Sequence, residues 1–98
     1  DAVDAYLSLI ENIENTKGQA YNIGGEVVMS IEDVVRSIVS KVDSTIDISY
    51  VEKGFPEMTH RYLDSNKIKK QTGWKPKTSF NDGLDMTIAF YKKYYKKD

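Results

Sequence analysis

The 98-residue sequence contains no cysteine and a single histidine, His60. Without cysteine the chain can form neither a disulfide scaffold nor a thiolate metal site, and one histidine excludes a metal site of several histidines. No apolar run reaches the roughly eighteen residues of a membrane-spanning helix, and the N-terminus lacks the basic-then-apolar pattern of a signal peptide. We therefore expect a soluble, cytoplasmic protein with no membrane partner and no bound metal.

The sequence also lacks an excess of charge of one sign. It has 14 lysines and arginines and 15 aspartates and glutamates, which gives a formal charge of −1. Such a chain has no general attraction for polyanions, so nucleic acid is not favoured as a partner. The length fits one small domain or a piece of a larger one, and a hydrophobic content of 40% is enough for a modest core.

The glycines are scattered, and none forms the Gly-x-Gly-x-x-Gly turn that cradles a phosphate. Two are adjacent, Gly24 and Gly25. This pair either makes a tight connection between strands or lets a ligand approach the backbone, and the first interpretation is favoured.

Four segments are expected to be helical, because apolar residues recur at helical spacing or because capping residues bound the segment. The expected helices cover Asp1–Asn15, Ile31–Val42 after the N-cap Ser30, the residues between Asp64–Ser65 and Gly73, and the residues after the N-cap Ser79. Three shorter segments favour strands: Gln19–Ile23, Val27–Met29 and Thr45–Val51. The expected fold class is α/β, a small mixed domain of about four helices and a few short strands.

The stretch Asp64–Phe80 joins the last two helices and contains the only tryptophan, Trp74. Gly73 can take the left-handed conformation that ends a helix, and Pro76 cannot continue one. Trp74 offers the largest apolar surface of the chain, so we expect it to fix this connection onto a core.

Two features allow other functions. His60 would be the base of a Ser/His/Asp site, but a lone histidine near a loop is more often a surface or packing residue. A hydrogen-bonding contact to a ligand is also favoured over the role of a base. The tail from Tyr91 to Lys97 would suit stacking and charge pairing with single-stranded nucleic acid, but a solvated helix end with two tyrosines packed inward needs no partner.

Three blocks, in this order, resemble the C-terminal part of the extended short-chain dehydrogenase/reductase family, the NAD-dependent nucleotide-sugar epimerases and dehydratases. The blocks are D-A-V-D-A-Y-L at Asp1–Leu7, Y-N-I-G-G at Tyr21–Gly25, and R-Y-L-D-S-N-K-I-K-K-Q-T-G-W-K-P-K-T-S-F-N-D-G-L at Arg61–Leu84. The third block resembles the family's D-x-S-K-A-(K/R)-x-x-L-G-W-x-P pattern near the C-terminus.

The resemblance implies that residues 1–98 are a C-terminal substrate-binding (cap) domain fragment without its Rossmann domain. In the family, that absent domain binds NAD(P) and holds the catalytic Ser/Thr, Tyr and Lys, so no cofactor site and no catalytic residue are expected in this chain. The implied partners are a UDP-, dTDP-, GDP- or CDP-sugar and the chain's own Rossmann domain. The first helix would normally pack beside the Rossmann sheet, so its apolar stripe is expected to be partly uncovered, and a homo-oligomer is a further expectation.

The resemblance also implies substrate-binding residues. Asn22 matches an asparagine that lines the nucleotide-sugar pocket in some members; the alternative is that Asn22 caps the turn at Gly24. Counting back from Asp64, Glu57 falls at the position of an acidic residue that often binds the nucleotide ribose.

The same count places Gly54 where the family has a diphosphate-binding arginine, and this is a departure from the pattern. Lys53 is one residue away and would supply the charge as a point ammonium without bidentate geometry. His60 and Arg61 are substitute candidates for the phosphate contact. A stand-alone non-catalytic nucleotide-sugar-binding or interaction module is the alternative function.

Overall fold

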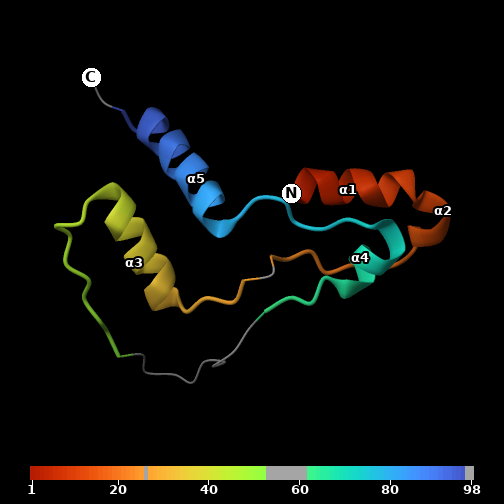
Figure 1. Cartoon of the computed structure of the whole chain (residues 1–98), viewed down its shortest axis with the longest axis horizontal. Coiled ribbons are helices and arrows are strands. Elements are labelled where there is room, and N and C mark those ends of the chain that lie inside the picture. The colour runs from red at the N-terminus through yellow and green to blue at the C-terminus, as the bar shows by residue number, and fades with distance from the viewer. Residues whose placement is uncertain (26, 53–61, 97–98) are drawn as a thin grey trace. The chain divides into compact units, whose positions relative to one another are not determined.

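The computed structural model describes residues 1–25, 27–52 and 62–96. Its helices are α1 (Ala2–Glu11), α2 (Ile13–Thr16), α3 (Ile31–Val42), α4 (Asn66–Thr72) and α5 (Phe80–Tyr94), as labelled in Figure 1. The chain divides into two compact units, one of Asp1–Val28 with His60–Thr78 and one of Met29–Thr59 with Ser79–Asp98.

The expected α/β class is wrong, because the described residues contain helices and no strand. An alternating segment becomes a strand only when a second extended segment supplies its ladder hydrogen bonds, and that pairing is not encoded locally. The alternation in Gln19–Ile23 does predict correctly which side chains of this segment are covered and which are exposed. Tyr21 and Ile23 are half-buried, whereas Ala20 and Asn22 are exposed.

The core of the first unit is small and is built around Trp74. Ala5 and Ile68 are fully buried and Trp74 is 6% exposed, with Leu9, Tyr21 and Ile23 packed against them. The indole Nε1 donates to the Asp1 carbonyl oxygen over 3.3 Å. Trp74 therefore fixes its connection onto a core, as predicted from the sequence.

The expected first helix is interrupted at Asn12, between α1 and α2. Thr16 stabilises this break, because its hydroxyl donates to the Leu9 carbonyl at 2.8 Å. The Asp1 carboxylate does not cap α1. It accepts instead from the backbone N–H groups of Lys77 (3.0 Å) and Thr78 (3.1 Å), and so holds the segment that follows Trp74.

The first helix also carries the uncovered apolar stripe that the resemblance implies. Val3, Tyr6, Leu7 and Ile10 are each more than half exposed.

The second unit pairs α3 with α5. Both helices begin at the predicted serine caps. The Ser30 hydroxyl accepts from the Asp33 N–H at 3.0 Å, and the Ser79 hydroxyl from the Asp82 N–H at 3.1 Å. An ion pair of 2.7 Å between Lys41 and Asp85 joins the two helices.

None of the described helices is long and apolar enough to cross a membrane.

Candidate functional site

The segment Ala20–Gly24, which carries Asn22, is held against α4. The Tyr21 hydroxyl hydrogen-bonds the Gln71 amide oxygen, and the Lys67 ammonium donates to the Ala20 carbonyl at 2.9 Å. The same ammonium lies 4.5 Å from the centroid of the Tyr21 ring, within reach of a cation–π interaction. These contacts at Ala20 and Tyr21, just before Asn22, tie the segment to α4.

Ser65 closes the other end of this segment. Its hydroxyl accepts from the Gly24 N–H at 3.0 Å and donates to the Gly24 carbonyl at 2.9 Å. Ser65 is the N-cap residue of α4 but makes no side-chain cap bond, and Asp64 accepts from the Asn66 N–H instead. Ser65, and not Asn22, therefore satisfies the polar groups of Gly24.

Gly24 is required by a close contact within the chain. A Cβ atom at this position would lie 2.9 Å from the Leu63 Cβ, closer than side chains tolerate. Because Gly24 has no side chain, Leu63 can pack against its backbone. The close approach to this glycine is therefore made by a residue of the chain itself.

Asn22 itself is exposed. Within the described ranges no side chain or backbone group hydrogen-bonds its amide, so both its donor and its acceptor are available to a ligand. The other predicted site residues, Lys53, Glu57, His60 and Arg61, lie outside the described residues, as does Gly54.

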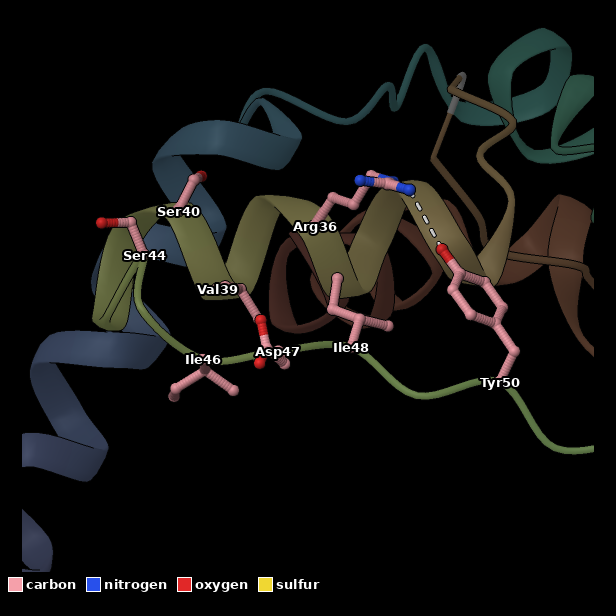
Figure 2. Close-up of a pocket in the computed structure, with 8 residues that line it drawn as sticks. All are labelled: Arg36, Val39, Ser40, Ser44, Ile46, Asp47, Ile48 and Tyr50. Carbon is pink, nitrogen blue, oxygen red and sulfur yellow. Dashed lines mark hydrogen bonds between the residues drawn. The ribbon is translucent and has the colours of Figure 1, made fainter.

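A second polar arrangement, in the other unit, was not anticipated from the sequence. The Glu32 carboxylate accepts from Arg36 through Nη2 at 2.7 Å and Nε at 3.0 Å, and from the Tyr50 hydroxyl at 2.8 Å. Figure 2 shows the further bond of 3.0 Å that Arg36 donates to the Tyr50 hydroxyl. The four-residue spacing of Glu32 and Arg36 on a helix was a readable signal, but the approach of Tyr50 was not.

This network borders an open groove of about 390 Å³ between α3 and the segment after it. Its walls combine apolar and polar side chains: Arg36, Val39, Ser40, Ser44, Ile46, Asp47, Ile48 and Tyr50 (Figure 2). The volume lies within the range of small-molecule sites, but Glu32 already neutralises the Arg36 guanidinium. The groove therefore presents no net positive charge for a phosphate.

The network shifts the pKa values of its members. The hydrogen bond from Arg36, with a smaller contribution from Tyr50, lowers the pKa of Glu32 below its ordinary value of 4.5. The hydrogen bond to Glu32 raises the pKa of Tyr50 above its ordinary value of 10.0.

These shifts make the stability of the fold depend on pH. The lowered pKa of Glu32 stabilises the folded state above pH 4.5, and this contribution is lost as pH falls through the folded-state pKa. For Tyr50 the contribution is present below pH 10.0 and is lost as pH rises through the folded-state pKa.

We expect Arg36→Met to move the pKa of Glu32 back up toward 4.5, because the variant removes the largest cause of the shift. A carbon-detected NMR titration of the Glu32 carboxyl in both proteins measures this change. A Glu32 that already titrates at 4.5 in the unmodified chain, with no response to the variant, would show that the network does not form in solution.

The tyrosine-rich end of α5 pairs its rings with one another. Phe90 stacks on Tyr94 with centroids 6.0 Å apart, and Tyr91 stacks on Tyr95 at 5.7 Å. The three tyrosines are each at least half exposed, so the expectation that two tyrosines of the tail pack inward is not met. These rings have stacking partners within their own helix and need no nucleic-acid base for that purpose.

Comparison with known proteins matches the chain to enzymes of nucleotide-sugar metabolism. UDP-D-apiose/UDP-D-xylose synthase 1 of Arabidopsis thaliana is 30% identical over 97% of this chain and 28% of the plant enzyme. The dTDP-glucose 4,6-dehydratase of Escherichia coli is 37% identical over 80% of this chain and 24% of the bacterial enzyme. The dTDP-D-glucose 4,6-dehydratase of Mus musculus is 29% identical over 97% of this chain.

No protein-family model matches the chain, and no solved structure matches it significantly. The chain spans only about a quarter of the length of the curated relatives, 28% for the plant synthase and 24% for the bacterial dehydratase. These matches confirm the resemblance drawn from the three sequence blocks: the chain is a homologue of the C-terminal part of the extended short-chain dehydrogenase/reductases of the epimerase/dehydratase type.

Proposed function

We propose that this chain is the nucleotide-sugar-binding portion of an NAD(P)-dependent sugar epimerase or dehydratase. It would position the nucleotide diphosphate for hydride-transfer chemistry that an N-terminal Rossmann domain carries out in the cytoplasm. The observation that carries the proposal is the similarity over 97% of this chain to a part, 28%, of an enzyme named for its UDP-sugars. NAD(P) would be held by the Rossmann domain and would supply the hydride chemistry there.

The contribution of this chain is binding and orientation. Holding a substrate in the geometry of reaction removes much of the entropic barrier, and a cap contributes by this route without touching the reacting atoms. The exposed amide of Asn22 supports the role, because it can donate to a diphosphate oxygen. Lys53, Glu57, His60 and Arg61 stay predicted contacts to the ribose and the phosphates.

An NMR titration of the ¹⁵N-labelled chain with dTDP-glucose and UDP-xylose tests the proposal, with glucose 1-phosphate as the nucleotide-free control. We expect binding with a Kd of about 1 mM, equivalent to roughly 4 kcal/mol, because the chain supplies only part of the contacts. A micromolar Kd would favour the stand-alone binding module instead. No response to any of the UDP-, dTDP-, GDP- and CDP-sugars at tens of millimolar would contradict the proposal.

The variant Asn22→Ala is expected to weaken nucleotide-sugar binding by about tenfold, because one hydrogen bond to a charged group contributes roughly 1.5 kcal/mol. Asn15→Ala is the matched control, since Asn15 is an exposed asparagine of the same unit in α2. The measurement is the Kd from the same titration. Equal affinities for the two variants would remove Asn22 from the site.

A further inference from the structure

Two side chains from the start of α4 bracket the segment that carries Asn22. The Lys67 ammonium donates to the Ala20 carbonyl, two residues before Asn22, at 2.9 Å. The Ser65 hydroxyl binds the N–H and the carbonyl of Gly24, two residues after Asn22. These contacts join residues 47 and 41 positions apart in the chain. They therefore fix the position of the segment relative to α4 and not merely its local conformation.

Tyr21 determines which side chain faces outward. Its ring lies under the Lys67 ammonium and its hydroxyl reaches Gln71, so this side chain is held on the α4 side. Successive side chains of an extended segment point to opposite faces. Holding Tyr21 inward consequently presents Asn22 outward, in agreement with their half-buried and exposed states.

We infer that Lys67 is a positioning residue for nucleotide-sugar binding, which acts by fixing Ala20 and Tyr21 and thereby orienting the Asn22 amide toward the ligand. This inference rests on the proposed function and assigns a role to a residue outside the predicted contacts. The Lys67 ammonium is directed to a carbonyl and a ring of its own chain. Its effect on the ligand passes through Asn22, and a direct phosphate contact is the competing role.

A double-mutant cycle on the 98-residue chain distinguishes the two roles. We expect Lys67→Met to raise the Kd for dTDP-glucose by about fivefold when Asn22 is present and by less than twofold in the Asn22→Ala background. Lys67→Arg keeps a donor and a cation over the ring, so its Kd should stay within about twofold of the unmodified chain. Lys70→Met is the matched control, an exposed lysine of the same helix, and should have no effect.

A second readout follows the segment without ligand. Lys67→Met should lower the ¹⁵N order parameters of Ala20–Gly24, because the segment loses its contacts with Lys67. It should leave the order parameters of α5 unchanged, because Lys67 belongs to the other unit. Lys70→Met should change neither.

Each outcome decides the inference. Equal effects of Lys67→Met in the two backgrounds, or unchanged order parameters in Ala20–Gly24, would overturn the positioning role and favour direct contact with the phosphate. If Asn22→Ala weakens binding and Lys67→Met does not, the inference fails and the proposed function stands. If the unmodified chain binds no nucleotide sugar, the proposed function fails, and the inference fails with it.

Discussion

Replacing Trp74 with alanine should destabilise the first unit by about 3–5 kcal/mol, the usual cost of removing a buried tryptophan side chain. Trp74 is 6% exposed, and among the described residues it shares its core with two other buried apolar residues, Ala5 and Ile68. So small a core cannot refill the space that the indole leaves. Small domains have a free energy of unfolding of only about 5–15 kcal/mol, so the substitution should remove a large part of the stability of this unit.

Urea unfolding followed by far-UV circular dichroism measures this loss, since the variant has no tryptophan fluorescence. Phe90→Ala is the control for removing an aromatic ring, because Phe90 is 60% exposed and its loss should cost less than about 1 kcal/mol. Trp74→Phe retains a ring in the core and gives up the bond to the Asp1 carbonyl, so its cost should lie between the two. Equal free energies of unfolding for Trp74→Ala and Phe90→Ala would show that Trp74 does not anchor this core.

The 98-residue chain, supplied with NAD and a nucleotide sugar, should show no epimerase or dehydratase turnover. The family's hydride chemistry needs a dinucleotide site and a Tyr-x-x-x-Lys pair, and in this sequence no tyrosine is followed four residues later by lysine. Enzymes accelerate such reactions by at least about a millionfold, so the expected contrast with a complete enzyme is very large.

The measurement is product formation by chromatography after long incubation, with Escherichia coli dTDP-glucose 4,6-dehydratase as the positive control. Turnover by the chain above the rate without protein would contradict a purely positioning role. It would also require a proton-transfer group among these residues.

Local features of the structure could be predicted from the sequence, because they depend on neighbours a few residues apart. Ser30 and Ser79 cap their helices as expected, and Gly73 ends α4 with a φ of 75°. In each case the residue type satisfies a backbone group or a backbone angle within its own turn.

Features that join distant parts of the chain could not be predicted in this way. Ser65 has the sequence signature of a helix cap, yet its hydroxyl binds Gly24, 41 residues away. Glu32 and Arg36 are readable as a helical pair, but the third member, Tyr50, arrives from a separate segment.

The strand predictions failed for the same reason. Alternation in Gln19–Ile23 reports which side chains are covered, but a strand also requires a partner segment whose register no local pattern encodes. The covering partner here is the helix α4, through Gln71 and Lys67, and not another strand. For the candidate site, a motif in the sequence predicts Asn22, and this stays a prediction. The contacts that hold its segment against α4 come from across the chain and could not be predicted from that motif.

The most direct test of the central claim is a map of where a nucleotide sugar touches the chain, obtained from backbone amide shifts with saturating dTDP-glucose. We predict that the perturbed amides cluster in Ala20–Gly25 and in residues 53–61, together with the side-chain amide of Asn22, while those of α5 stay unchanged. Perturbations confined to the Arg36–Tyr50 groove or to α5, with none at Asn22, would contradict the account.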